Sequence, residues 1–109
     1  MFDHDLFCKT FQELLLQMRQ ENFISQTKLS RKAGISRQSI YLMENGLRIP
    51  SFEKFCRLAD GVGMSPVEMS QRFLSIYQAN QSQAALNLAE NNAKGAYNAK
   101  AKKKRIVSK

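Results

Sequence analysis

The side chains best suited to binding chemistry lie on one face of a predicted helix that runs from Arg37 to Asn45. Four of them follow the i, i+3, i+4, i+7 spacing of a single helical face: Gln38, Tyr41, Leu42 and Asn45. Ile40 and Met43 fall on the opposite face, where we expect them to be buried. Arginine can pair with the edge of guanine, and glutamine with that of adenine. The helix therefore indicates recognition by hydrogen bonds.

A second short helix and a tight turn must position this face. Ser25 is a good N-cap for the first helix, in which Leu29 and Ala33 share one side. Gly34 can adopt the positive φ that ends a helix and turns the chain sharply. Ser36 then caps the second helix. The stretch from Ser25 onward therefore predicts a helix-turn-helix motif.

The chain has no group of residues typical of catalysis. It lacks paired carboxylates in an apolar setting, a Cys–His pair and a glycine-rich phosphate loop. Its single histidine, His4, lies near the N-terminus, and Cys8 and Cys56 lack metal-ligand spacing. We expect both cysteines to be buried free thiols. The sequence therefore predicts no enzyme, no metal site and no cofactor.

Positive charge is concentrated in two parts of the chain. The net charge of +8 consists of +1 for residues 1–93 and +7 for residues 94–109, which contain seven basic residues and no acids. Within the first part, residues 26–60 carry +4, whereas the segments before and after them are slightly negative. This distribution favours a polyanion as the partner of the predicted motif.

Length and composition limit the other possibilities. A chain of 109 residues with 43% hydrophobic residues is expected to form one domain, with a tail. Its apolar runs are too short for a membrane span, and no signal peptide is visible. We expect a cytoplasmic, nucleoid-associated protein that does not contact a membrane.

Three further helices are predicted around the motif. Asp3 can cap a first helix that ends near Glu21 and carries an apolar face: Phe7, Phe11, Leu14, Leu15 and Met18. Ser51 caps a fourth helix, whose expected inward residues are Phe52, Phe55, Cys56, Leu58, Ala59 and Val62. Ser65, Pro66 and Glu68 form a strong start for a fifth helix. Its apolar face is Met69, Phe73, Ile76 and Tyr77.

The run from Leu15 to Met69 resembles the DNA-binding domain of the phage repressor and Cro family of bacterial regulators, also called the XRE family. The similar pieces are LLQMRQENFISQ, LSRKAGISRQSIYLMENG and RIPSFEKFCRLADGVGMSPVEM. The resemblance implies an all-α, five-helix domain that binds double-stranded DNA. It also implies a homodimer that binds a palindromic operator through the major groove, most often as a repressor.

The resemblance also assigns roles to individual residues. Arg19 and Glu44 would form a structural ion pair, although Arg19 could instead be a solvated surface residue. The proposed base-reading residues are Arg37, Gln38 and Leu42. Leu42 could contact a thymine methyl group or pack against the core or a partner subunit, and Arg37 could contact only a phosphate. The proposed contacts to the DNA backbone are Ser25, Gln26, Lys28, Ser36, Ser39, Tyr41, Asn45 and Arg48.

The C-terminal third of the chain allows two interpretations. Residues 1–77 form the predicted DNA-binding domain, and residues 78–93 could extend the fifth helix or be loosely ordered. Residues 94–109 are predicted to be a basic flexible tail that contacts phosphates through Lys100, Lys102, Lys103, Lys104 and Arg105. A nuclear localisation signal at Lys102–Arg105 is a weaker alternative. A second hypothesis for the whole chain is an antitoxin or adaptor whose protein partner binds the fifth helix or the tail.

Overall fold

The computed structural model describes residues 1–101, and it describes side chains up to Glu90. These residues form five helices and no strand, which confirms the expected all-α fold. The chain divides into two compact units after Gln78. Four of the residues predicted to contact phosphates lie outside the described residues: Lys102, Lys103, Lys104 and Arg105.

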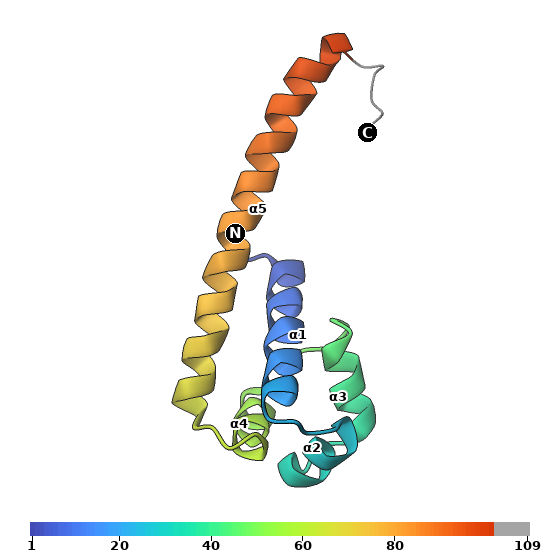
Figure 1. Cartoon of the computed structure of the whole chain (residues 1–109), viewed down its shortest axis with the longest axis vertical. Coiled ribbons are helices and arrows are strands. Elements are labelled where there is room, and N and C mark those ends of the chain that lie inside the picture. The colour runs from blue at the N-terminus through green and yellow to red at the C-terminus, as the bar shows by residue number, and fades with distance from the viewer. Residues whose placement is uncertain (102–109) are drawn as a thin grey trace. The chain divides into compact units, whose positions relative to one another are not determined.

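The helices follow one another through short connections (Figure 1). Their bounds are α1 His4–Glu21, α2 Gln26–Ala33, α3 Arg37–Glu44, α4 Phe52–Gly61 and α5 Pro66–Ala101. The helix α3 ends one residue earlier than predicted, because Asn45 serves as its C-cap. Helices α2 and α3 form the predicted helix-turn-helix.

Serine side chains begin the helices of the motif and the helices that follow it. The Oγ atoms of Ser25, Ser36 and Ser51 each accept a hydrogen bond from the backbone N–H three residues later, at 3.0, 3.1 and 3.2 Å. At the start of α5, Ser65 Oγ accepts from Glu68 N, and Glu68 Oε1 accepts from Ser65 N. This reciprocal pair is the predicted capping box.

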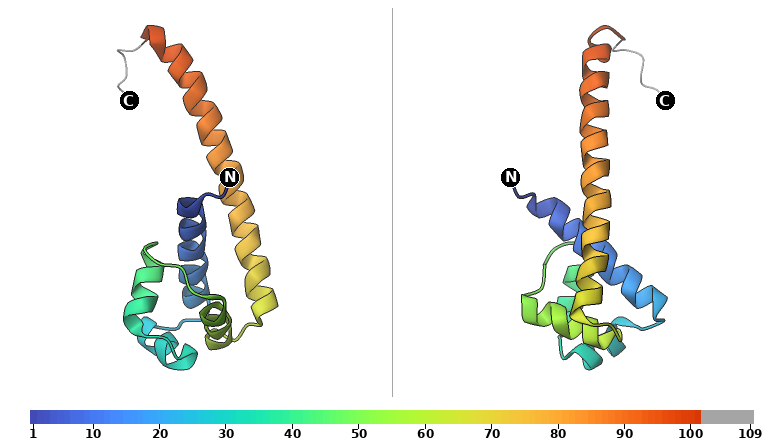
Figure 2. Two further views of the ribbon diagram at one scale, coloured as in Figure 1. Left: turned by 180° about the vertical axis from the view of Figure 1, so that it is seen from behind. Right: turned by 90° about the vertical axis from the view of Figure 1, so that its left-hand side faces the viewer.

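Helix α1 lies between α3 and the first turns of α5 in the first unit (Figures 1 and 2). Helix α2 packs against both α3 and α4. The shared core consists of Phe11, Leu14, Leu15, Met18, Ile24, Leu29, Ala33, Ile35, Ile40, Met43, Leu58, Ala59, Val62, Met69 and Phe73. Phe7, Phe55, Ile76 and Tyr77 are partly buried against it. The apolar faces predicted for α1 and α5 are therefore confirmed.

One core prediction for α4 is wrong. Phe52 was expected to pack inward, but it is 78% exposed. It shares a helical face with Phe55 and Ala59, but it is the first residue of α4, directly after the cap Ser51. Because helical side chains tilt toward the N-terminus, its ring extends past the end of the helix and stays exposed. Phe55 and Cys56 are half-buried, while Leu58, Ala59 and Val62 are buried.

The fifth helix is longer than the charge pattern suggested. Residues 94–109 were predicted to be a flexible tail, but α5 continues to Ala101. The physical reason is that alanine and lysine are good helix formers, and a helix already nucleated over the core is extended at little cost. The soft stripe expected in this extension, Ala84, Ala85 and Leu88, is exposed to solvent, as is Leu86.

Candidate nucleic-acid interface

The turn between α2 and α3 is held by backbone geometry and one side chain. Gly34 has a φ of +69°, which favours glycine, and it ends α2. Ser30 Oγ donates a hydrogen bond to the Ile35 carbonyl on the far side of the turn. Ile35 itself is buried. The orientation of α3 on α2 is therefore supported by Ser30 as well as by apolar packing, a bond that the sequence pattern did not indicate.

Helix α3 has a buried and an exposed side. Ile40 and Met43 are almost completely buried, as predicted. Exposed side chains occupy the opposite side: Arg37, Gln38, Tyr41 and, at the C-cap, Asn45. Leu42 is half-buried at the edge between the two sides. Arg37 and Gln38 thus stand in the first, exposed turn of the helix, with their hydrogen-bonding groups available to a ligand.

Ser39 lies differently from the other residues of the predicted row. The residue is buried, with only 7% of its surface exposed. Ser36 Oγ donates a hydrogen bond to Ser39 Oγ at 2.9 Å, and Arg48 Nη1 donates to the same oxygen at 3.0 Å. Ser39 is therefore placed to hold Arg48, an exposed residue of the loop after α3, against the start of α3.

A polar cluster joins α1, α2 and α3. Both carboxylate oxygens of Glu44 accept hydrogen bonds from Arg19, through Nε and, at 2.9 Å, Nη2. Gln26 Nε2 donates to Glu44 Oε1 at 2.8 Å, and Arg19 Nη1 donates to the Ile24 carbonyl at 3.0 Å. The side chains of Arg19 and Glu44 are 20% and 4% exposed. We call Arg19, Gln26 and Glu44 the Glu44 cluster.

The charges within the Glu44 cluster compensate each other, which leaves the exposed side of α3 suited to binding an anion. The hydrogen bonds with Glu44 raise the pKa of Arg19, so the guanidinium remains charged. Glu44 carries the only negative charge of α3, and Arg19 neutralises it. The exposed side of α3 therefore presents Arg37 without an opposing carboxylate nearby on the same helix.

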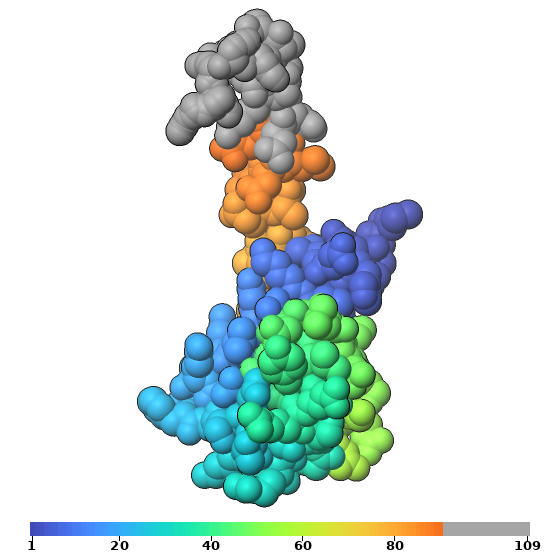
Figure 3. Space-filling view, turned by 90° about the vertical axis from the view of Figure 1, so that its right-hand side faces the viewer, coloured from blue at the N-terminus to red at the C-terminus, as the bar shows by residue number. Residues whose placement is uncertain are grey.

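The start of α2 and the loop after α3 flank the exposed side of α3. Ser25 and Lys28 are exposed and Gln26 is half-buried at the first turn of α2. The N–H groups of a first helical turn and the partial positive charge of that helix end are suited to a phosphate. In Figure 3, the surfaces of α2 and α3 lie side by side on the face turned to the viewer.

The end of α3 is ordered by its own cap. Asn45 Nδ2 donates a hydrogen bond to the Tyr41 carbonyl at 2.8 Å, so this amide nitrogen has an intramolecular partner. Tyr41 and Leu47 are exposed. Arg48 supplies the exposed cation of the loop between α3 and α4.

The arrangement of α2 and α3 agrees with the result of a comparison with known protein families. The family model described as Helix-turn-helix matches residues 15–69, which is half of the chain. The chain belongs to the helix-turn-helix family. This helix-turn-helix protein is of the phage repressor and Cro type, and it is a DNA-binding regulator of transcription. The searches of curated proteins and of solved structures found no match.

The described part of the helix-turn-helix protein was also compared with the requirements for spanning a membrane and for binding a metal ion. Over the described residues, no helix has the length and apolar character needed to cross a membrane. Within the same part of the chain, no three His, Cys, Asp or Glu side chains are grouped in a way that could hold a metal ion. The prediction that the chain lacks a Cys–His pair is wrong, because residues four apart on a helix are neighbours and Cys8 Sγ lies 3.4 Å from His4 Nε2 on α1.

The basic residues assigned to phosphates lie largely beyond the described part of the helix-turn-helix protein. Lys100 belongs to the last turn of α5. The other four residues of that prediction, Lys102 to Arg105, have no described position. Their proposed role therefore depends on charge alone.

Proposed function

We propose that the protein represses transcription as a homodimer bound to a near-palindromic operator, with α3 in the major groove. The observation that carries this proposal is the exposed first turn of α3, where Arg37 and Gln38 stand opposite the buried Ile40 and Met43. These two side chains can read guanine and adenine. Leu42, at the edge of the same side, is suited to a thymine methyl group.

The flanking residues fit contacts with the sugar–phosphate backbone. Ser25, Gln26 and Lys28 surround the positive end of α2, and Arg48 and Asn45 extend the surface past the end of α3. Tyr41 can stack along the backbone or donate its hydroxyl to a phosphate. Ser36 and Ser39 are suited to a supporting role, because they bond to each other and Ser39 bonds to Arg48.

Repression is the simplest outcome of such binding. A dimer that covers two half-sites would occlude polymerase from an overlapping promoter. With one recognition helix per subunit, the two half-sites would lie about one helical turn, roughly 34 Å, apart. A cytoplasmic location with access to the nucleoid is consistent with this proposal.

Selection from random DNA tests the proposal. Fragments retained by the full chain at a fixed salt concentration would be sequenced over successive rounds. We expect enrichment of an inverted repeat whose half-sites are separated by about ten base pairs. Enrichment of a single unpaired half-site would reject the dimeric arrangement, and no enrichment would reject sequence-specific binding.

A protein partner on α5 is the second candidate. Leu86 and Leu88 are exposed large apolar residues in the extension of α5 beyond Gln78. Such residues are common in contacts between proteins, including antitoxins or adaptors and their targets. Copurification of a different protein whose binding is lost in Leu86→Glu and Leu88→Glu, with operator binding intact, would support this function.

A further inference from the structure

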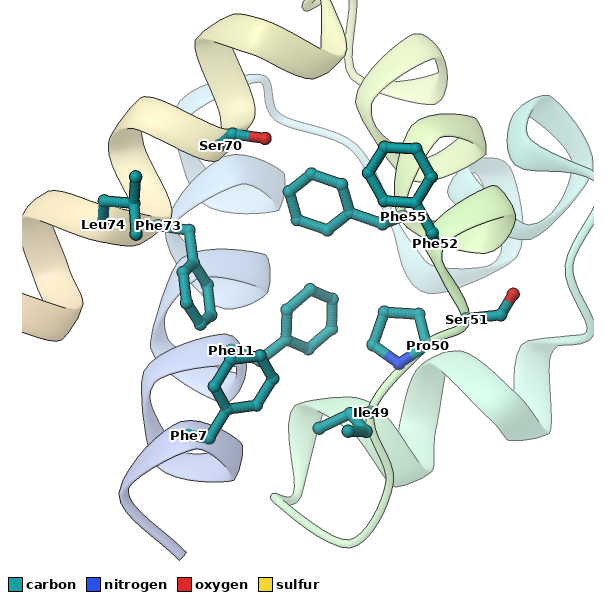
Figure 4. Close-up of a pocket in the computed structure, with 10 residues that line it drawn as sticks. All are labelled: Phe7, Phe11, Ile49, Pro50, Ser51, Phe52, Phe55, Ser70, Phe73 and Leu74. Atoms are coloured by element: carbon teal, nitrogen blue, oxygen red, sulfur yellow. The ribbon is translucent and has the colours of Figure 1, made fainter. Parts of the chain in front are cut away.

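A hollow lies in the first unit (Figure 4), and no residue of α3 lines it. Its volume is about 370 Å³. Helices α1, α4 and α5 and the segment before α4 contribute its walls. Ten residues line it: Phe7, Phe11, Ile49, Pro50, Ser51, Phe52, Phe55, Ser70, Phe73 and Leu74. The volume is within the range of about 300–1,000 Å³ that is usual for small-molecule sites.

Aromatic rings dominate the walls of the hollow. The rings of Phe11 and Phe55 have their centroids 6.2 Å apart, and those of Phe7 and Phe73 are 4.9 Å apart. Figure 4 shows these rings around a common space, with Pro50 on the side of the connecting segment. Such walls favour a flat, aromatic occupant, because aromatic pairs gain energy beyond the burial of their surface.

The polar groups of the hollow are two hydroxyls, and no ionisable side chain lines it. Ser51 Oγ accepts a hydrogen bond from Lys54 N at 3.2 Å, so its hydroxyl hydrogen can still be donated to a ligand. Ser70 contributes the second hydroxyl. A charged ligand would lose its hydration without gaining a counter-charge. The lining therefore selects a neutral molecule with one or two hydrogen-bonding groups.

The size of the hollow argues against a folded protein as its occupant. A standard protein interface takes about 20–30 residues from each side, whereas ten residues line this concave site. Phe52 and Leu74, at its rim, are exposed to solvent. A small molecule would cover these apolar surfaces without needing a larger complementary face.

One wall of the hollow continues into the proposed DNA contacts. Ile49 and Pro50 directly follow Arg48, whose guanidinium is bonded to Ser39 at the start of α3. An occupant that packs against Ile49 and Pro50 would restrict this segment. The segment would then lose less conformational entropy when Arg48 contacts a phosphate, because the occupant has already restricted it before DNA binds.

We propose that this hollow is an effector site for a neutral aromatic small molecule, and that its occupation strengthens DNA binding through the Arg48 segment. The binding site itself is independent of the proposed function. Only its effect on DNA depends on the proposed contact of Arg48 with the DNA backbone.

Titration of the full chain with N-phenyl-1-naphthylamine, a neutral fluorescent aromatic amine, tests the site. We expect saturable binding with one molecule per chain. Ser70→Leu should fill the hollow and weaken binding about tenfold or more, since a side chain would then occupy the ligand's space. Ser75→Leu adds the same side chain at an exposed position of α5 outside the hollow and should leave binding unchanged. Equal binding by both variants would overturn the proposal.

A second variant and a second measurement keep the result interpretable. Phe52→Ala changes only an exposed rim residue, so the variant should fold normally and weaken binding of the probe severalfold. It therefore tests the site if Ser70→Leu fails to fold. Sedimentation of each variant in the same buffer tests whether a second copy occupies the hollow instead. Loss of self-association in Ser70→Leu, without probe binding in the unmodified chain, would overturn the proposal in favour of a subunit interface.

The effect on DNA is measured separately with the selected operator. Saturating probe should raise operator affinity about fivefold or more, and operator should raise probe affinity by the same factor. Unchanged or weaker operator binding, with probe bound at one molecule per chain, would overturn the link to Arg48. Failure to bind any DNA with intact probe binding would instead reject the proposed function and leave the binding site established.

Discussion

At the scale of single residues, Glu44 is the point where three helices exchange hydrogen bonds. It is 4% exposed and accepts from Arg19 on α1 and from Gln26 on α2. A buried carboxylate is stable only when it is paired and its oxygens are satisfied. The cluster thereby fixes the positions of α2 and α3, on which the proposed DNA contacts depend.

Removing one partner of this cluster should be costly. Arg19→Ala and Glu44→Ala should each lower the free energy of unfolding by about 2–4 kcal/mol, because the first leaves the buried Glu44 carboxylate without its cation and the second leaves the partly buried Arg19 guanidinium without its anion. The double variant should lose clearly less than the sum of the two. Urea denaturation of the three variants measures these differences.

Arg57 and Glu53 provide the matched control. They form an ion pair between positions i and i+4 on α4, but their side chains are 50% and 75% exposed. The corresponding alanine variants should change the free energy of unfolding by less than about 0.5 kcal/mol. Additive losses of similar size in both pairs would show that the Glu44 cluster has no special structural role.

Phe23 has a backbone conformation that is unfavourable for a residue with a bulky side chain. It has a φ of +51°, in the left-handed region that non-glycine residues rarely adopt, and it is 94% exposed. Asparagine tolerates this region better. Phe23→Asn should therefore raise the free energy of unfolding by about 0.5–1 kcal/mol in denaturant melts. A loss of stability would show that the ring makes a contact important to the fold.

At the scale of elements, α2 and α4 approach each other at Gly61. A Cβ atom at this position would lie 2.8 Å from Leu29 Cδ1 and 3.4 Å from Ala33 Cβ. Helix propensity by itself makes Gly61 a weak position in α4, since it favours alanine over glycine. The structure shows that the missing side chain permits close helix packing.

Alanine at this position should therefore destabilise the fold. Gly61→Ala should lower the free energy of unfolding by about 1–3 kcal/mol, through overpacking against Leu29. In the background of Leu29→Val, which lacks the Cδ atoms, the same change should cost much less. Chemical denaturation of the four proteins of this cycle measures the difference, and an equal cost in both backgrounds would contradict the packing explanation.

A surface ion pair joins α1 to the start of α5. Arg72 donates to both carboxylate oxygens of Glu21, at 3.0 and 2.8 Å. These hydrogen bonds lower the pKa of Glu21. A carboxyl whose pKa is lowered by folding stabilises the native state above its unfolded pKa, and this contribution disappears as the pH falls through the folded pKa.

The acid dependence of stability should reflect this pair. In Glu21→Gln, stability should fall less between about pH 6 and about pH 3 than in the unmodified chain. The difference should shrink at high salt, because the pair is exposed to solvent. Thermal melts across this range at two salt concentrations measure it, and parallel curves for the two proteins would show that the pair contributes nothing.

Local signals predicted the elements well, whereas contacts between distant residues needed the structure. The serine caps and the turn at Gly34 follow from neighbouring residues alone. The pair of Arg19 and Glu44 was suggested by family resemblance, since periodicity does not report which helices meet. The bond from Arg48 to Ser39 gave no signal, because it depends on how the loop after α3 folds back.

The errors have related causes. Phe52 was assigned to the core from the apolar spacing of α4, but it is the first residue of that helix, and its side chain tilts toward the N-terminus, past the end of the helix. The helical part of residues 94–101 was missed because the basic segment was considered by itself, apart from the helix that it continues. In both cases the local pattern of residues was interpreted without regard to where the residues lie along their helix.

At the scale of the whole molecule, positive charge and base recognition are separated along the chain. Seven of the basic residues lie in residues 94–109, with no acids among them, whereas Arg37 and Gln38 lie on α3. We propose that the C-terminal charges contact phosphates without regard to sequence. Each phosphate neutralised would contribute about −0.9 to the slope of log affinity against log salt.

A chain that ends at Ala93 tests this separation. It should bind the operator more weakly and with a shallower salt dependence, but with nearly the same preference among sequences. Fluorescence titrations of both forms at several salt concentrations measure the two slopes. Equal slopes would reject the phosphate contacts, and a lost preference would show that this segment takes part in sequence recognition.

The most direct test of the central claim, that α3 reads bases, is the affinity of Gln38→Ala for two DNA duplexes at one salt concentration. On the selected operator we expect a loss of about 1–3 kcal/mol in binding free energy, with relaxed specificity at one base pair. On an unrelated duplex, affinity should barely change. Gln20→Ala, which removes an exposed glutamine from α1, is the control and should bind both duplexes normally. An equal loss on both duplexes would mean that Gln38 contacts only the backbone and would contradict the claim.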